Sequence, residues 1–226
     1  MISDRKRPQA RGYATPWLLV VAAITIIAWP ILLPPDAVTG SLVENGPVEI
    51  ASGAAHFLTA VVAAILALKF GGVLAFLAVL SVLMGLRELD MHSAATTHGV
   101  FSLKLYSSPD VRLTAKVSSF ISVVVLIGAL AVLAWRNRRG IQRLFARGTL
   151  TRASAVAFVA ALPVLKIVDG LPRNLADFDV VLSDMTLLRL LSFEEIGEMF
   201  LPALVLLLVV QIVATSRRPN LDPAQR

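Results

Sequence analysis

Long apolar runs without a single charged residue decide what this 226-residue chain can fold into. Pro16 to Pro35, Phe70 to Leu86 and Val117 to Trp135 contain no Asp, Glu, Lys or Arg. Each run approaches the roughly 20 residues that a helix needs to cross about 30 Å of hydrocarbon. Only 16% of the residues are charged and the mean hydropathy is +0.77. A soluble domain carries about 25% charged residues, so the sequence predicts an integral membrane protein.

Three further apolar runs each contain or adjoin one ionisable residue. Ile50 to Leu68 contains His56, Ile196 to Ser216 contains Glu198, and the short run from Ala153 ends at Lys166. The last of these spans only if Lys166 reaches towards the interface or lies inside the bundle. We therefore predict an all-α, polytopic protein with six transmembrane helices in one domain. The predicted spans are about 16–35, 50–68, 71–90, 110–135, 153–169 and 194–216, between short basic tails at 1–14 and 217–226.

The charges of the loops predict how the six spans are oriented across the membrane. The two tails, the 69–72 turn and the 136–152 loop carry fourteen of the 21 Lys and Arg residues. The positive-inside rule then places both termini in the cytoplasm of a bacterial-type inner membrane. The opposite, outer end receives thirteen of the 15 acidic residues and all three histidines.

Local signals predict where several helices begin and end. Ser108-Pro109-Asp110 is typical of a helix start, and Asp169-Gly170 is typical of a helix end. Ser192 to Glu195 matches a capping box, which would assign Glu194 and Glu195 to the first turn of the last helix. The preceding stretch, 172–193, is expected to form an interfacial segment or a short helix that leads into the sixth span.

The loop from Arg136 to Arg147 interleaves five arginines with Ile141, Leu144 and Phe145. This pattern predicts a topology anchor that lies on anionic lipid. The net charge of +6 does not indicate nucleic-acid binding, because no nucleic-acid motif accompanies it. With no cysteine in the chain, thiolate metal sites and disulfides are excluded.

Two helices bring carboxylate and imidazole groups to the outer end. Glu49, Ser52 and His56 share one helix face by their i, i+3, i+7 spacing. Glu88 and His92 are four residues apart and could share a cation, or could form a simple ion pair. His56 is a candidate metal ligand or general base, and the alternative is a neutral histidine bonded to a neighbouring helix.

The same layer contains basic residues and further acids. Lys166 and Asp169 are three residues apart and are expected to pair, whereas Glu198 lies too deep for a helix-start role. The candidate catalytic residues are therefore His56, Glu88 and Glu198. Candidate substrate-binding residues are Arg87, Lys116 and Lys166. The sequence does not identify a cofactor; if it is a divalent metal, the candidate ligands are His56, Glu88, His92, Asp169 and Glu198.

Two membrane-hydrolase patterns are matched only in part. Ser52-x3-His56 resembles the Ser-x3-His of the ceramidase-like CREST families, but their later HxxxH pair is absent. Glu194-Glu195 resembles the start of the EExxxR motif of CPBP intramembrane proteases, but Met199 stands where the arginine belongs. These departures place the chain in neither family.

Three functions remain compatible with these residues. A bound metal would activate water for a hydrolase or transferase that acts on a lipid or lipid-linked substrate. Alternatively, the acidic layer is an ion-pair network or docking surface of a scaffold, partner subunit or sensor. An ion- or proton-coupled transporter is the third alternative, since Pro163 and Pro202 can break helices near the midplane.

Overall fold

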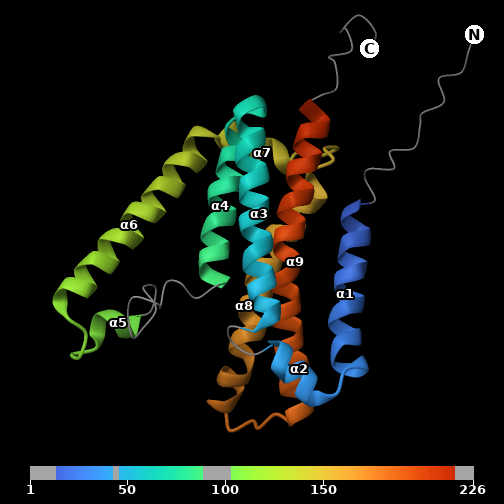
Figure 1. The fold of residues 1–226 in the computed structure, drawn as a ribbon, viewed down its shortest axis with the longest axis vertical. Helices are drawn as coiled ribbons and strands as arrows, with labels where there is room; N and C mark the ends of the chain where they lie inside the picture. The colour runs from blue at the N-terminus through green and yellow to red at the C-terminus, as the bar shows by residue number, and fades with distance from the viewer. Residues whose placement is uncertain (1–13, 43–45, 89–102, 217–226) are drawn as a thin grey trace, which may run out of the picture.

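The computed structural model describes residues 14–42, 46–88 and 103–216, and 87% of these residues are helical, with no strand among them. Five helical segments are long and apolar enough to cross a membrane: Ala14–Leu32, Pro35–Phe70, Leu113–Arg136, Arg152–Ala176 and Asp184–Ser216. Many large apolar side chains on these helices are exposed on the protein surface, as lipid-facing residues are. The predicted all-helical membrane architecture is confirmed at this level. Apart from Leu113–Arg136, these helices stand side by side along most of their length (Figure 1).

The first two helices form a bent arm along one side of the bundle. α1 (Ala14–Leu32) contains Pro30 near its end, and α2 (Pro35–Leu42) begins at a proline. Proline suits the first position of a helix because its missing N–H has no partner there in any case. The indole N–H of Trp29 donates to the hydroxyl of Ser41 at 3.2 Å, which fixes the bend between the two helices.

α3 (Pro47–Phe70) and α4 (Gly72–Glu88) form a tight antiparallel hairpin. Gly71 makes the turn with φ of +99°, a conformation that side-chain-bearing residues rarely adopt, and its N–H donates to the carbonyl of Ala67 at 3.0 Å. The two helices approach closely at Gly85, where a Cβ atom would lie 3.2 Å from the Cβ of His56.

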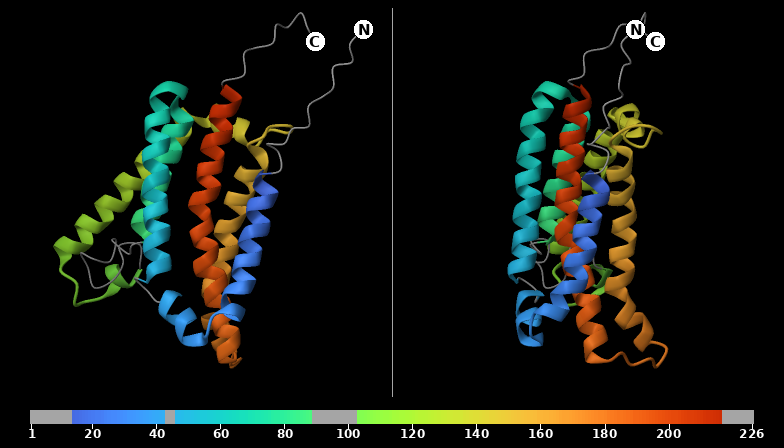
Figure 2. Two further views of the ribbon diagram at one scale, coloured as in Figure 1. Left: turned by 45° about the vertical axis from the view of Figure 1, so that its right-hand side comes forward. Right: turned by 90° about the vertical axis from the view of Figure 1, so that its right-hand side faces the viewer.

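α8 (Arg152–Ala176) and α9 (Asp184–Ser216) form a second antiparallel pair beside the first (Figure 2). Their close approach occurs at Gly197, where an added Cβ would clash with the side chain of Leu165. α9 begins at Asp184, ten residues before the predicted start of the sixth span at residue 194. Ser183 caps it by accepting a hydrogen bond from the N–H of Thr186 at 3.3 Å.

The capping box predicted at Ser192 is wrong, since Ser192 lies inside α9. Its hydroxyl donates to the carbonyl of Leu188 one turn earlier, at 2.8 Å, instead of capping a helix start. The predicted stop at Asp169-Gly170 is also wrong, because α8 continues to Ala176. Local capping patterns were overridden in both places by packing of α8 against α9.

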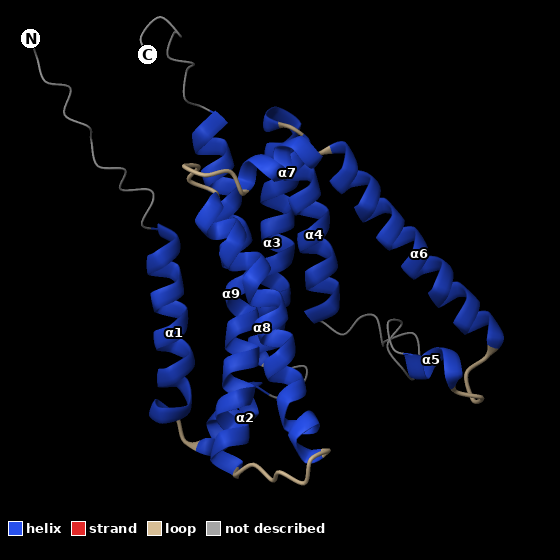
Figure 3. Cartoon of the chain, turned by 180° about the vertical axis from the view of Figure 1, so that it is seen from behind, coloured by secondary structure: helices blue, strands red, loops and turns tan. Residues whose placement is uncertain are grey.

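α5 (Leu103–Ser107), α6 (Leu113–Arg136) and α7 (Arg138–Leu144) form a separate arm. The helix predicted from Ser108 starts instead at Leu113, since residues 108–112 form the turn after α5. α6 inclines away from the bundle and meets α4 and α7 (Figure 3). α7 packs this arm against α4. Gly140 leaves room for the side chain of Val73, and Gly72 leaves room for the side chain of Asn137.

The largest apolar core lies between the two helix pairs and includes Leu74, Leu77, Leu204 and Leu208. A polar triad ties α1 to α8 and α9 near the end of the bundle where the described chain begins and ends. The hydroxyls of Thr15 and Ser154 are 2.6 Å apart, and Ser154 donates to Gln211 Oε1 at 2.9 Å. All three residues are buried, so the triad satisfies polar groups that would otherwise face an apolar core.

Candidate functional site

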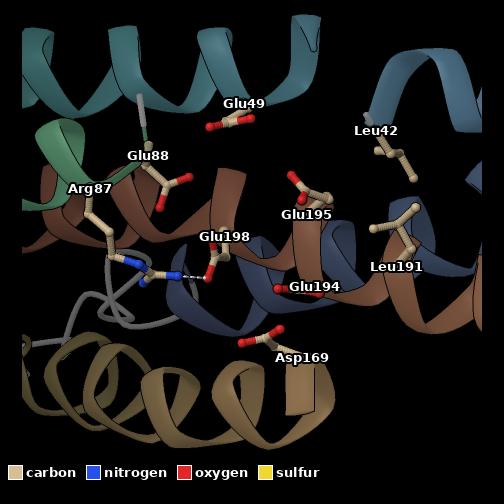
Figure 4. A pocket seen from close by; sticks show the side chains of 9 residues that line it. All are labelled: Leu42, Glu49, Arg87, Glu88, Asp169, Leu191, Glu194, Glu195 and Glu198. Atoms are coloured by element: carbon tan, nitrogen blue, oxygen red, sulfur yellow. Dashed lines mark hydrogen bonds and ion pairs between the residues drawn. The ribbon is translucent and has the colours of Figure 1, made fainter. Parts of the chain in front are cut away.

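A cavity of 420 Å³ opens at the other end of the bundle, which we call the acidic end. Six of the residues around it carry carboxylates and one carries a guanidinium group. The lining residues are Leu42, Glu49, Arg87, Glu88, Asp169, Leu191, Glu194, Glu195 and Glu198 (Figure 4). These residues come from five different helices, so tertiary packing, and not one local motif, builds the cavity.

α9 supplies the largest share of the cavity wall. Leu191, Glu194, Glu195 and Glu198 follow i, i+3, i+4, i+7 spacing, which places them on one face of the helix. α3 adds Glu49 from its first turn, and α2 adds Leu42. α4 ends at the cavity with Arg87 and Glu88, and α8 contributes Asp169 opposite them.

Among the described residues, two ion pairs lie at this end. Arg87 donates through Nη2 to Glu198 Oε1 and so connects α4 to α9. Lys166 pairs with Asp169 along α8, as their spacing predicts. Within the described part of the chain, Arg87 is the one cationic side chain that lines the cavity. If all six carboxylates are ionised, they exceed the lining's positive charge by five.

Glu88 differs from the other carboxylates by its burial. It is only 5% exposed, and its Oε1 atom has no hydrogen-bond partner within the described part of the protein. Figure 4 shows its side chain extending from α4 into the cavity, next to Glu198. A buried carboxylate oxygen without a partner is costly, so the hydrogen-bonding capacity of Glu88 is unmet within the described residues.

Below Glu88, the interface of α3 and α4 holds further polar atoms without partners. They are Ser52 Oγ, both ring nitrogens of His56, and Ser81 Oγ, and none of these residues is more than 1% exposed. Together with Glu88 Oε1, they are all the buried unpartnered side-chain polar atoms found in residues 14–42, 46–88 and 103–216. Unmet polarity is thus concentrated in one interface directly beneath the cavity.

The structure brings together some, but not all, of the candidate residues from the sequence. Arg87, Glu88, Asp169 and Glu198 line the cavity. His56 lies deeper, with 0% exposure and no contact with the cavity lumen. Lys166 stands at the edge, where it pairs with Asp169. Lys116 lies on α6 and does not line the cavity.

Metal binding was expected from five residues, of which His92 lies outside the described residues. Within the described ranges, no three His, Asp or Glu side chains are arranged so that they could hold one metal ion. The carboxylates surround the cavity and do not converge on a single point. The metal ligand set therefore stays a prediction.

Glu49, Glu194 and Glu195 are cavity residues that the sequence did not select as candidates. Glu194 and Glu195 were assigned to a helix start, but they lie more than two turns inside α9. The sequence feature that could have identified them is their spacing from Leu191 and Glu198, which places all four residues on one face of a helix. Glu49 had the analogous signal through its spacing with Ser52 and His56.

Comparison with known proteins gives no match to a protein family, a curated protein or a solved structure. The function is therefore argued from the geometry and charge of the cavity.

Proposed function

We propose that this protein spans a membrane six times and that its acidic end faces the outside. Five spans follow from helix length and composition, and α4, with 17 residues, is the sixth. The start of α1 and the end of α9 lie at the same end of the bundle, which an even number of crossings requires (Figure 1). α7, with three arginines, lies near that end, where the positive-inside rule favours the cytoplasm. Its arginines would then rest on anionic lipid.

The acidic cavity binds a multivalent cation in this proposal. The observation that carries it is a lining of six carboxylates against one arginine, with the buried oxygen of Glu88 unpartnered. Like charges held this close repel, and the repulsion is strongest where protein and lipid exclude water. A bound cation would relieve that repulsion.

Cavity size favours a cation of several atoms. A volume of 420 Å³ falls in the range of small-molecule sites, about 300–1,000 Å³. A metal ion requires ligands that converge, and the described side chains include no group of three that does so. Carboxylates spread around a wide cavity fit a ligand with separated positive charges.

Binding at one face, without passage across the membrane, is the mode that the packing supports. Beneath the polar layer, Leu74, Leu77, Leu204 and Leu208 are almost fully buried in a continuous apolar core. Transporter sites typically lie near the midplane between broken helices. A receptor, sensor or partner subunit that binds a cation at its outer face fits this packing better than a transporter does.

Titration of the purified protein in lipid nanodiscs tests this function. Spermidine, cadaverine, Mg²⁺, Ca²⁺, Mn²⁺ and Zn²⁺ would each be added and followed by calorimetry. The double variant Glu194→Gln/Glu195→Gln should lower the affinity for the cation that binds by about tenfold or more. Asp177→Asn/Asp184→Asn removes the same charge from exposed positions outside the cavity and should leave the affinity within about twofold. Equal losses in both double variants would contradict a cavity site.

A metal-assisted hydrolase or transferase acting on a lipid substrate is the second candidate. The observation that favours it is the buried imidazole of His56 beneath the buried carboxylate of Glu88. It requires a stoichiometric metal in the purified protein and hydrolysis that is lost in His56→Ala. Metal analysis of the intact protein separates it from the first proposal, because a receptor for an organic cation retains no metal after purification.

A further inference from the structure

The carboxylates of the cavity are not equivalent. Glu198 is paired with Arg87, and Asp169 is paired with Lys166, so both already have a cationic partner. Glu88 is more than nine-tenths buried, points into the cavity, and has an oxygen without a partner. An acidic cluster alone attracts cations without selecting among them, whereas a buried carboxylate with a free oxygen defines one position for a charge.

The surroundings of Glu88 limit what that charge can be. The hydroxyl of Ser52 is buried next to the Glu88 carboxylate, and a hydroxyl that donates to a carboxylate keeps its lone pairs as acceptors. Both side chains present oxygen atoms that accept hydrogen bonds. A ligand group that satisfies the oxygen atoms of both residues must therefore be positive and must donate hydrogen bonds in more than one direction.

Three classes of cation meet these requirements unequally. A quaternary ammonium carries the charge but has no N–H to donate. A metal ion needs more converging ligands than the described residues bring together. A primary ammonium group carries one positive charge and three N–H donors, as the lysine side chain does.

We propose that Glu88 anchors a primary ammonium group of the ligand, with Ser52 as a second acceptor. This assignment rests on the proposed cation-binding function and names the chemical class of its ligand. The ammonium group lies at the floor of the cavity against Glu88 on α4, and Ser52 on α3 is buried beneath that carboxylate. Remaining positive groups of the ligand lie towards Asp169, Glu194 and Glu195.

A pair of ligands separates hydrogen bonding from charge. Cadaverine carries two primary ammonium groups, and its fully N-methylated bis-quaternary analogue carries the same two charges at the same spacing. The wild-type protein in nanodiscs should bind cadaverine at least about tenfold more tightly, because hydrogen bonds to charged groups are worth that much in affinity.

Matched variants locate the source of this preference. Glu88→Gln keeps the size of the side chain but removes its charge, and should reduce the preference for cadaverine to less than about threefold. Ser52→Ala should reduce it partly. Glu194→Gln removes one charge elsewhere in the lining and should weaken both ligands by a similar factor, which leaves their ratio unchanged.

Each outcome decides the assignment. A wild-type protein that binds both ligands equally, or a Glu88→Gln variant that keeps the full preference, overturns the primary-ammonium site but leaves cation binding intact. Binding of Mn²⁺ or Zn²⁺, with neither organic ligand bound, overturns the ligand class. If no cation binds at all, the proposed function fails together with this inference. Thermal unfolding confirms that Glu88→Gln is folded, and Glu88→Asp, which keeps the charge on a shorter side chain, provides a second test.

Discussion

Arg87 and Glu198 pair across 111 residues of sequence and fasten the end of α4 to α9. The guanidinium side chain is 48% exposed, whereas the carboxylate is only 13% exposed. The pair therefore forms at the boundary between the cavity and its surroundings. Of the lining residues that the structure describes, this arginine alone carries a positive charge.

Removing the positive charge of Arg87 should lower the stability of the protein slightly and raise its affinity for cations. Arg87→Gln removes the guanidinium that pairs with Glu198, so we expect a loss of about 1 kcal/mol or less in unfolding free energy, given the exposure of the guanidinium. The affinity for the bound cation should rise several-fold at the same time. Calorimetry and thermal unfolding in nanodiscs measure the two effects. The swapped variant Arg87→Glu/Glu198→Arg should restore both, and its failure in a folded protein would show that geometry, not charge, matters here.

His56 offers a test that separates the two candidate functions. Both ring nitrogens are buried without partners, and such groups cost about 1–3 kcal/mol each. His56→Leu should therefore unfold at the same temperature as the wild type or a higher one. Cation affinity should stay within about threefold, because His56 does not line the cavity. Complete loss of function in this stable variant would favour the metal-dependent enzyme.

Much of this arrangement could be predicted from the sequence, and the reasons for the exceptions are physical. Alternate connections of a helical bundle share an end, so Glu88, Asp169 and Glu198 were expected together. The pairing of Lys166 with Asp169 follows from helical spacing. The pairing of Arg87 with Glu198 could not be predicted, because the helix spacing around Arg87 carries no information about a partner 111 residues away.

Glu194 and Glu195 show the limit of local patterns. Ser192 to Glu195 has the composition of a capping box, yet the helix continues through it because α9 packs against α8 there. The energetic contribution of a cap, about 1 kcal/mol, is small beside that of burying a helix face. Tertiary packing therefore determines where α9 begins. As a result, Glu194 and Glu195 lie inside the helix and line the cavity.

The close approach of α3 and α4 at Gly85 should be sensitive to side-chain size. Gly85→Val should destabilise the protein by about 1–3 kcal/mol, since even a Cβ atom would lie 3.2 Å from the Cβ of His56 and 3.3 Å from the carbonyl oxygen of Gly53. It should also weaken cation binding, because Glu88 lies one turn further along α4. Gly128→Ala on α6 is the control. No atom lies within 4 Å of its added Cβ, so stability should stay the same or rise by about 0.5–1 kcal/mol. Unfolding in nanodiscs measures both variants, and equal behaviour would contradict the packing.

The polar triad at the opposite end should contribute measurably to stability. Ser154→Ala removes the hydroxyl that lies between Thr15 and Gln211, and leaves these two residues only the long hydrogen bond from Gln211 Nε2 to Thr15 Oγ1, at 3.5 Å. Hydrogen bonds between membrane helices are worth about 0.6–2 kcal/mol, so we expect a loss of that size. Ser118→Ala, at an exposed site on α6, provides the control. Equal unfolding temperatures for Ser154→Ala and the wild type would show that the triad adds nothing.

The arginines of α7 should determine orientation. Replacing Arg138, Arg139 and Arg143 by Gln removes the basic charge that is expected to stay in the cytoplasm. Reporter fusions at the C-terminus should then show a mixture of orientations, whereas the same number of Gln substitutions at Arg112, Arg173 and Arg189 should leave a single orientation. A single orientation in both variants would contradict the proposed topology.

α8 and α9 each reach from the cavity to the polar triad. α8 carries Asp169 in the cavity lining and Ser154 in the triad, and α9 carries Glu198 and Gln211 in the same way, about 20 Å apart along the helix. The side chain of Leu165 packs against Gly197, the residue before Glu198. The closest contact of the two helices therefore lies beside the cavity, where it sets the separation of the α8 and α9 carboxylates.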